Sequence, residues 1–368
     1  MLKVQAQLQN GKTLEALNQE LGIMATHHDV LPLVILNYNQ IESPKTHSIV
    51  RECRGLVLNK EDWSIVAKSM DRFFNWGEVA DEMPLFNWDK AQALEKVDGS
   101  LCLFYHFNGE WHVNTCGSFA GGSMFNTEWQ AKYHKMPQDF TWKQGILSAL
   151  GIKDLAELNL DPALTYVGEF CSLWNKVVRE YPQPCVYLLS CFAGEEEVGP
   201  RPCPFRNVES YSLRSVEEIQ NFVQTHPEVT FEGVVVKDDA NRRWKIKNAK
   251  YLALSRLKGN NDHWNPKYLL PFILANEGDE LLTYFPESEM VYRQCKAKVD
   301  AAFIELQTVW EQHNKITVQK EFALAIVGKT PFSSVLFQIR KQLGNRQTLA
   351  DLKKAWTEST DTILKNLF

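Results

Sequence analysis

Lys96 stands in the segment Glu95-Lys96-Val97-Asp98-Gly99-Ser100, where a lysine amine could act as a nucleophile. The amine must lose its proton before it attacks, and its ordinary pKa is about 10.4. Nearby cations or a dry pocket lower that pKa. Gly99 lets the backbone turn tightly and come close to a ligand. Because Lys-x-Asp-Gly also occurs in ordinary loops, the segment alone is weak support for a nucleophilic site.

Further charged residues follow Lys96 at the edges of expected strands. Glu169 lies in an apolar run, Glu232-Gly233 opens another, and Lys245 and Lys247 alternate with an isoleucine. On a strand both lysines would face one side, where they could hold phosphates and lower the pKa of Lys96. Glu232 could hold Mg²⁺, which prefers oxygen ligands. The alternatives are surface carboxylates, a solvated strand face and an ordinary strand glycine.

The order of these motifs resembles the covalent nucleotidyltransferase superfamily of DNA ligases, RNA ligases and capping enzymes. Two upstream segments narrow the resemblance to the phage-type RNA ligase 1 family: Glu52-Cys53-Arg54-Gly55-Leu56 and Met70-Asp71-Arg72-Phe73-Phe74-Asn75. The stretch from Glu169 to Val178 also resembles that family. The likeness covers roughly residues 48–255.

The resemblance implies an ATP-dependent RNA ligase that works in three steps. Lys96 would attack the α-phosphorus of ATP, expel pyrophosphate and form a covalent lysyl–AMP. The AMP would pass to an RNA 5′-phosphate, and an RNA 3′-hydroxyl would then displace it. Each step is an in-line displacement, in which catalysis is mostly positioning and charge neutralisation. The implied cofactors are ATP and Mg²⁺, with Mn²⁺ as an alternative, and the implied partner is single-stranded or broken RNA, transfer RNA included.

The same resemblance assigns roles to individual residues. The catalytic group would comprise Lys96, Asp98, Lys245 and Lys247. Nucleotide binding would involve Arg54, Arg72, Phe74, Glu95, Gly99, Glu169, Glu232, Gly233 and Tyr251. Glu169 would contact the ribose hydroxyl, Arg54 a phosphate, and both Glu232 and Glu169 a metal ion. The alternatives are a surface salt bridge for Arg54 and core packing for Phe74.

Two positions depart from the family pattern. Arg72 stands where the family usually has a lysine, and the two cations bind phosphate differently. Cys116 stands directly before Gly117-Ser118, where the family has another lysine. A positive charge is therefore missing there or supplied by another residue.

The elements that must position these residues indicate an α+β fold. The patterns predict a mixed body of strands and helices over residues 1–255 and an all-helical domain over residues 256–368. The resemblance implies that the first is a nucleotidyltransferase (ATP-grasp-like ligase) domain of antiparallel sheets with helices and that the second selects the RNA. Asn108-Gly109 between two strand-like runs predicts a hairpin. The remaining expectations are a helix at 11–30, strands at 48–59, 101–107, 164–170, 185–192, 233–237 and 242–247, and helical stripes at 291–309 and 349–367.

Composition limits the other possibilities. The chain has 40 Lys and Arg against 45 Asp and Glu, so it cannot coat nucleic acid by overall charge. Eight cysteines without a Cys-x-x-Cys pair indicate buried free thiols in a reducing compartment. We expect a monomer in the cytoplasm, the host's if the source is a virus, with no membrane segment. Two alternatives to an RNA ligase are another covalent nucleotidyltransferase, either a DNA ligase or a capping enzyme, and a non-catalytic RNA-binding relative. A DNA ligase or capping enzyme would continue into a β-barrel after the Lys-x-Lys strand.

Overall fold

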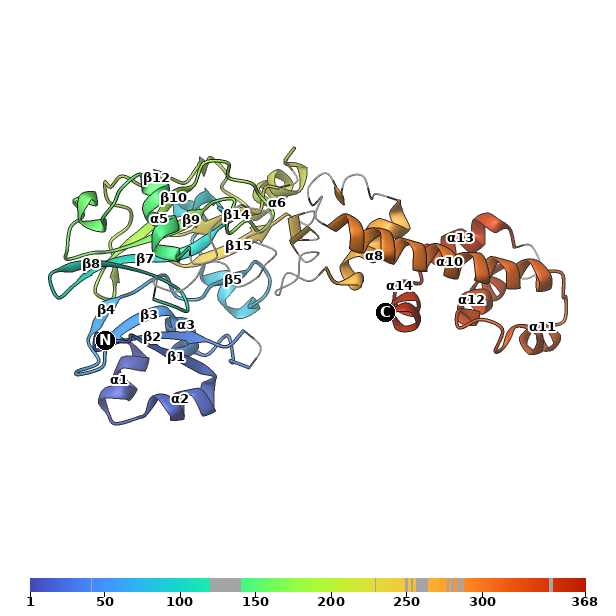
Figure 1. Cartoon of the computed structure of the whole chain (residues 1–368), viewed down its shortest axis with the longest axis horizontal. Helices are drawn as coiled ribbons and strands as arrows, with labels where there is room; N and C mark the ends of the chain where they lie inside the picture. The colour runs from blue at the N-terminus through green and yellow to red at the C-terminus, as the bar shows by residue number, and fades with distance from the viewer. Residues whose placement is uncertain are drawn as a thin grey trace. The chain divides into compact units, whose positions relative to one another are not determined.

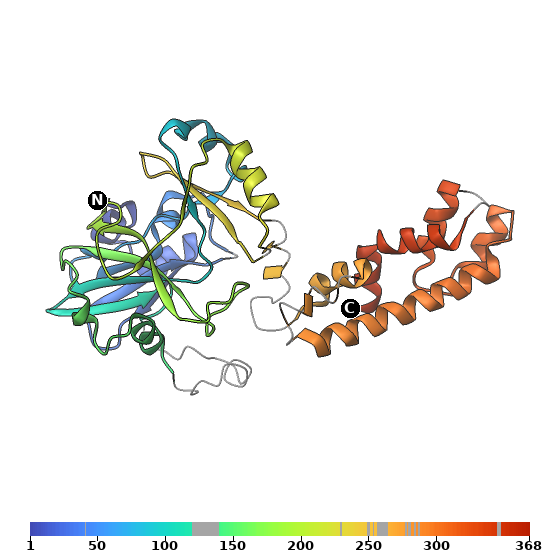
Figure 2. The same ribbon diagram turned by 90° about the horizontal axis from the view of Figure 1, so that it is seen from above.

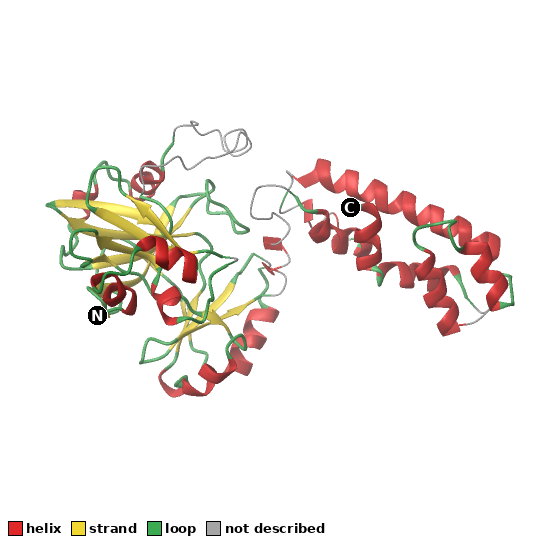
Figure 3. Ribbon diagram, turned by 90° about the horizontal axis from the view of Figure 1, so that it is seen from below, coloured by secondary structure: helices red, strands yellow, loops and turns green. Residues whose placement is uncertain are grey.

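The chain divides into two compact units, Met1–Tyr251 and Leu252–Phe368, in the computed structural model. The structure describes residues 1–40, 42–119, 140–228, 230–248, 251–252, 254–255, 264–276, 278, 281–282, 285, 288–343 and 347–368. The expected boundary after residue 255 adjoins residues 256–263, which lie outside this description. In the described residues, strands occur in the first unit and helices make up the second (Figure 3). The α+β prediction is confirmed.

The first layer of unit one is a four-stranded antiparallel sheet in the order β1-β2-β3-β4. Its strands are β1 (Ile23–His27), β2 (Leu33–Tyr38), β3 (Arg54–Asn59) and β4 (Ile65–Ala67). Helices α1 (Lys3–Gln9) and α2 (Leu14–Leu21) cover one face of it (Figure 1). Their buried side chains, such as Leu8 and Leu17, pack against Val34 and Leu56.

Two expectations in this layer were partly wrong. The helix expected at 11–30 ends at Leu21, because Gly22 adopts a left-handed conformation (φ 65°) and the chain continues as β1. The strand expected at 48–59 begins as helix α3 (Ser48–Glu52). The Glu52 carboxylate at the end of α3 accepts hydrogen bonds from the backbone N–H groups of Lys3 and Val4. It thereby satisfies the free N–H groups at the start of α1.

The second layer is a six-stranded sheet in the order β11-β10-β9-β7-β8, with β12 (Arg206–Asn207) beside β10. Its strands are β7 (Ser100–Phe107), β8 (Glu110–Thr115), β9 (Thr165–Cys171), β10 (Cys185–Ala193) and β11 (Glu196–Glu197). The predicted hairpin is confirmed, and Asn108 and Gly109 both have positive φ. One face packs on the first layer. Helix α5 (Trp142–Leu150) and the 3₁₀ turn η3 (Leu155–Leu158) cover the other face.

The third sheet holds the strands expected at 233–237 and 242–247, in the order β13-β6-β14-β15-β5. Its strands are β5 (Phe74–Asn75), β6 (Gln92–Glu95), β13 (Ser210–Tyr211), β14 (Gly233–Lys237) and β15 (Arg243–Lys247). The 3₁₀ turns η1 (Ala80–Leu85) and η2 (Trp88–Lys90) precede β6. Helix α6 (Val216–Thr225) lies along one face of this sheet (Figure 2). Its side chains Ile219 and Val223 are buried in the core on that face. The opposite face therefore carries Lys245 and Lys247.

The second unit is helical in the residues that the structure describes. Its helices are α8 (Pro266–Ala275), α10 (Glu289–His313), α11 (Gln319–Ile326), α12 (Ser333–Leu343), α13 (Leu349–Thr357) and α14 (Thr360–Leu367). The stripe expected at 291–309 forms the buried face of α10. The stripe expected at 349–367 is two helices, and Thr348 with Asp351 forms the capping box that begins α13. No helix in this described part is both long and apolar enough to cross a membrane.

Candidate active site

Lys96 lies where the chain leaves β6 of the five-stranded sheet and enters β7 of the six-stranded sheet. Its backbone N–H donates to the carbonyl oxygen of Gly233 at 2.9 Å, which fixes the loop against β14. A cavity of about 190 Å³ opens beside it. The charged residues that line this cavity are Arg54, Glu95, Lys96, Glu169, Arg243, Lys245 and Lys247. Most of the predicted charged residues therefore meet in one place.

Glu232 joins the expected nucleophile to one lysine of the Lys-x-Lys pair. Its two carboxylate oxygens pair with the Nζ atoms of Lys96 and Lys247, each at 2.8 Å. Burial lowers the pKa of Lys96, but the carboxylates of Glu232 and Glu169 outweigh burial, so the pKa ends above its usual value. This is opposite to the predicted direction, because the sequence did not show that a buried carboxylate contacts the amine directly.

The neighbouring cations lower the pKa of Lys245 rather than that of Lys96. Burial and the nearby charges of Arg54, Lys96 and Lys247 lower the pKa of Lys245 to about 7. Its Nζ lies 4.6 Å from the centroid of the Phe73 ring. Lys245 and Lys247 share one face of β15 while their neighbours Trp244 and Ile246 are buried on the other, as the alternation predicted.

Glu169 and Arg54 complete the polar wall of the cavity. Burial raises the pKa of Glu169 to about 7, although Lys96 and Arg54 oppose the shift. The buried Nη1 atom of Arg54 has no hydrogen-bond partner among the described residues, although the guanidinium lies 5.5 Å from the Phe73 ring. A buried guanidinium N–H without an acceptor fits an anionic ligand such as a phosphate.

Whether a divalent metal ion fits this site depends on the carboxylates that could bind it. Mg²⁺ commonly binds through one or two carboxylates, waters and substrate phosphates. Glu232 and Glu169 supply such oxygens, although both oxygens of Glu232 are engaged by lysines. No cluster of three or more potential protein ligands occurs in the described part of the chain. The donor set therefore fits a metal that shares its ligands with a phosphate-bearing substrate.

Asp98, Glu95 and Tyr251 hold the Lys96 loop in place. The Oδ2 atom of Asp98 accepts hydrogen bonds from the backbone N–H groups of Val178 and Arg179, both at 3.0 Å. The hydroxyl of buried Tyr251 also hydrogen-bonds to Asp98. Glu95 pairs with the Nη1 atom of Arg179 at 2.5 Å. Burial, with Glu232 nearby, raises the pKa of Asp98 despite these donors.

The two motif glycines are required by the chain's own packing. A Cβ atom on Gly99 would lie 2.4 Å from the carbonyl oxygen of Phe170 in β9. A Cβ atom on Gly233 would lie 2.2 Å from the carbonyl oxygen of Ile246, and its φ of 138° is unfavourable for other residues. Both glycines let strands approach closely beside Lys96, and the expected close approach to a ligand stays a prediction.

Arg72 and Phe74 lie at a different cavity from Lys96. They line a space of about 490 Å³, and Met70, Phe73 and Arg243 line both cavities. The Nη1 atom of Arg72 donates to the hydroxyl of Tyr38 at 2.8 Å, and the guanidinium stacks near the Phe74 ring. Phe74 is buried in the core of the five-stranded sheet, which agrees with the packing alternative.

Cys116, at the position of the missing family lysine, is half-buried and lies near Arg54. Burial raises the pKa of its thiol, and the Arg54 charge opposes that shift. Arg54 is thus a cation close to the position where the family has lysine. All eight cysteines are free thiols.

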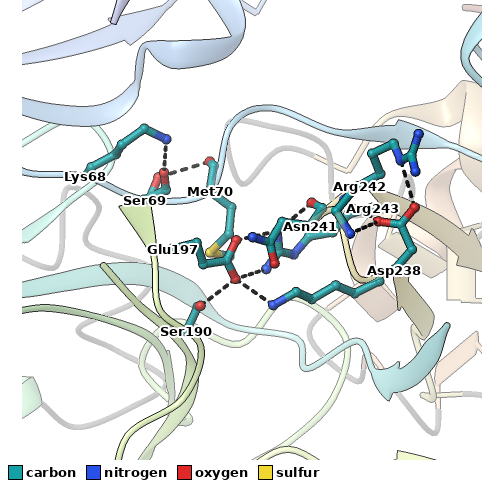
Figure 4. A network of polar contacts seen from close by, with 11 residues as sticks. Lys68, Ser69, Met70, Ser190, Glu197, Asp238, Asn241, Arg242 and Arg243 are labelled. Carbon is teal, nitrogen blue, oxygen red and sulfur yellow. Dashed lines mark hydrogen bonds and ion pairs between the residues drawn. The ribbon is translucent and has the colours of Figure 1, made fainter. Parts of the chain in front are cut away.

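Glu197 forms a buried network that the sequence motifs did not reveal. It accepts hydrogen bonds from Ser190 (2.6 Å) and Lys237 (2.8 Å) and pairs with both terminal nitrogens of Arg243 (Figure 4). Burial would raise the pKa of Glu197, but Arg243 and Lys237 lower it to about 2. Because Glu197 lies in β11 and its cationic partners in β14 and β15, the network joins two sheets that line the cavity.

Two sheets that carry facing charged residues, with the Lys-x-Asp-Gly loop passing from one to the other, define the class as a covalent nucleotidyltransferase fold. A family model described as RNA ligase matches residues 52–252. The chain belongs to this family, the phage-type RNA ligase 1 family that the sequence resembles.

Individual proteins that are similar to this chain are also named as RNA ligases. The chain is 29% identical over 340 residues to a bifunctional polynucleotide kinase/RNA ligase of Autographa californica nuclear polyhedrosis virus, covering 86% of this chain and 46% of that protein. It is 25% identical over 348 residues to the RNA ligase of Rhodothermus phage RM378, covering 75% and 78%. The chain thus spans less than half of the first relative. A solved archaeal ATP-dependent RNA ligase is 14% identical with a TM-score of 0.42, over 96% of this chain and 95% of that one; a likeness this weak supports no conclusion about activity.

Proposed function

We propose that the protein is an ATP-dependent RNA ligase that joins RNA 5′-phosphate and 3′-hydroxyl ends. The observation that carries this proposal is the placement of Lys96, its carboxylate partner Glu232, and Lys245 and Lys247 around one cavity. Membership in the RNA ligase family supports the choice of RNA as substrate. The names of two relatives as RNA ligases support the same choice.

In the first step, the Nζ atom of Lys96 attacks the α-phosphorus of ATP. The N–P bond forms as the P–O bond to the β-phosphate breaks, and pyrophosphate leaves. Lys96 must first release its proton, and Glu232 opposes this while it pairs with the ammonium. We infer that the nucleotide complex draws Glu232 away from Lys96, which removes the main charge that raises the pKa of that amine.

The remaining cations bind and orient the phosphates. Lys247, Lys245 and Arg54 line the cavity with Lys96, and the Nη1 atom of Arg54, which has no partner among the residues that the structure describes, can donate to a phosphate. A bound Mg²⁺ or Mn²⁺ would neutralise phosphate charge and would be held by Glu232 and Glu169. Asp98 positions the loop rather than touching the nucleotide, since its carboxylate is engaged by Val178, Arg179 and Tyr251.

In the later steps, AMP passes from Lys96 to an RNA 5′-phosphate, and an RNA 3′-hydroxyl displaces AMP to close the phosphodiester bond. We propose residues 1–255 as the catalytic domain for all three steps. Residues 256–368 would form a helical domain that selects the RNA, with broken transfer RNA among the candidates. We further propose a monomer that acts in the cytoplasm.

The test is incubation of the protein with Mg²⁺ and α-labelled ATP, and separately with labelled GTP. We expect a covalent protein–AMP adduct from ATP that is labile to acid and stable to alkali, as a P–N bond is, and that is lost in Lys96→Ala. The labelled protein should then join a 5′-phosphate, 3′-hydroxyl RNA. Label from GTP alone would favour a capping enzyme, and no label from either nucleotide would favour a non-catalytic RNA-binding relative.

A further inference from the structure

The segment between β9 and β10 contacts the Lys96 loop through Arg179, a residue outside the predicted site. Arg179 makes two kinds of contact with that loop. Its side-chain Nη1 pairs with Glu95, the residue before Lys96, at 2.5 Å. Its backbone N–H donates to Asp98, two residues after Lys96, at 3.0 Å. One residue therefore fixes both flanks of the expected nucleophile.

Neighbouring groups hold Arg179 in this position. The guanidinium carbon lies 5.4 Å from the centroid of the Tyr181 ring, a favourable arrangement for a cation and an aromatic face. The Tyr181 hydroxyl accepts a hydrogen bond from the backbone N–H of Asp98 at 3.4 Å. The N–H group of Val178 adds a second hydrogen bond to the Asp98 carboxylate, beside the one from Arg179. The segment 178–181 thus forms a brace along one side of the loop.

Arg179 is not among the described residues that line either cavity, whereas Glu95 is. The Glu95 side chain is 12% exposed, so its carboxylate is poorly screened by water. A charge-assisted hydrogen bond between such groups is stronger and more directional than a neutral one. Arg179 therefore contacts the Lys96 loop without lining either of the two cavities described above, and Glu95 is the side chain through which it reaches the site.

We propose that Arg179 is a positioning residue for lysine adenylylation, which holds Lys96 in line with the α-phosphorus through its contacts to Glu95 and Asp98. The inference rests on the proposed function. Displacement of a reacting group by about 1 Å can cost about 10²-fold in rate, even when the cause is remote from the chemistry. The loop is short and its two ends are fixed in different sheets, so a loss of the brace would move Lys96 itself.

The test compares rate constants for protein–AMP formation, measured over a range of ATP concentrations, in the full chain and in four variants. Arg179→Ala removes the side-chain pair but keeps the backbone donor to Asp98. Arg179→Lys keeps a charge that can reach Glu95. The combined Arg179→Ala and Glu95→Gln variant removes both partners, and Arg214→Ala is the matched control because Arg214 is an exposed arginine of the same unit. Thermal unfolding of each variant checks that it is folded.

We expect Arg179→Ala to lower the rate at saturating ATP by about 10- to 100-fold, with the ATP concentration for half-maximal rate changed by less than about threefold, since positioning acts on the transition state. Arg179→Lys should recover most of the loss. The combined variant should stay as slow as Arg179→Ala, because both substitutions break one contact. Arg214→Ala should match the unsubstituted protein.

The results distinguish a failure of the proposed function from a failure of the role proposed for Arg179. If the unsubstituted protein forms no protein–AMP, the proposed function fails. If it does and Arg179→Ala reacts at the same rate, only the role of Arg179 is overturned. Recovery of the full rate in the combined variant would also overturn it, because Arg179 would then merely neutralise Glu95.

Discussion

Substitution of Glu232 by glutamine should separate the reactivity of the Lys96 amine from the activity of the site. Glu232 pairs with Lys96 and Lys247 at 2.8 Å each, and only 6% of its side chain is exposed. The glutamine keeps the shape and one acceptor oxygen but removes the charge. The pKa of Lys96 should therefore fall, because burial and the neighbouring cations would no longer be outweighed.

The size of this fall follows from Coulomb's law. Two unit charges about 4 Å apart interact by about 4 kcal/mol at an effective dielectric constant of about 20. Each 1.4 kcal/mol of that energy corresponds to about a tenfold change in the neutral fraction of Lys96. Because 21% of the Lys96 side chain is exposed, solvent screening should reduce this interaction to about 1.4–3 kcal/mol. The neutral fraction of Lys96 at neutral pH should rise by about 10- to 100-fold.

The assay is acylation of lysines by a small amine-reactive reagent over a series of pH values, with the extent at Lys96 read by mass spectrometry. The titration midpoint of Lys96 should be lower in Glu232→Gln than in the unsubstituted protein. Glu180→Gln is the matched control, because it removes the carboxylate partner of Lys176 at the exposed end of an ion pair. An unchanged Lys96 midpoint in Glu232→Gln would refute the argument that Glu232 keeps this amine protonated.

The same variant should lose adenylylation even though its amine is more reactive, since Glu232 is the proposed metal ligand. Stability gives a further check. The pKa of Glu232 is lowered in the folded protein, because its lysine partners outweigh burial. Its contribution to the free energy of unfolding is thus present above the ordinary carboxyl pKa and lost as the pH falls. Glu232→Gln should therefore destabilise the protein more at pH 7 than at pH 3.

Gly233→Ala should lower the free energy of unfolding by about 3 kcal/mol or more in chemical denaturation, because its Cβ would meet the Ile246 carbonyl oxygen at 2.2 Å. The control Gly117→Ala should be tolerated, because the nearest atom to its Cβ would be 3.6 Å away. Glu169 has a folded pKa of about 7 against an ordinary 4.5, so its contribution to stability is lost as the pH rises through this interval. Glu169→Gln should therefore gain stability relative to the unsubstituted protein at pH 8 and not at pH 4; an equal effect at both would contradict the assigned shift. Lys245 has a folded pKa of about 7 against 10.5, so stability is lost as the pH falls from 10.5 to 7. Lys245→Met should be more stable at pH 7 by denaturation yet lose protein–AMP formation by about 10²-fold or more, as expected for removal of a phosphate-binding cation.

The sequence predicted the fold class and the residues that surround the cavity because these depend on local patterns. Alternation along β15 placed Lys245 and Lys247 on one face, and Asn108-Gly109 was sufficient for the hairpin. The strand β2 was missed although Leu33 to Leu36 is a continuous apolar run, the pattern of a strand buried on both faces. Helix α3 was missed because its formation depends on the contact of Glu52 with α1.

Other features of the site depend on contacts between distant segments. The sequence could not show that Glu232 would pair with Lys96, and so the direction of the pKa shift at Lys96 was wrong. It could not separate Arg72 from the Lys96 cavity, because both belong to motifs of one family. Arg179 carried no local signal at all, since its partner Glu95 lies 84 positions away in the sequence.

The buried carboxylate of Glu197 has a consequence for how the site can accommodate substrates of different size. It links β11 to β14 and β15 through hydrogen bonds to cations that have little access to water. Breaking such a link leaves buried charges without partners, at a cost of about 3–5 kcal/mol. The distance between β11 and the strands β14 and β15 is therefore fixed by this network. Adjustment to a larger or smaller ligand must come from side chains such as Lys96, Lys247 and Arg54, and not from separation of the sheets.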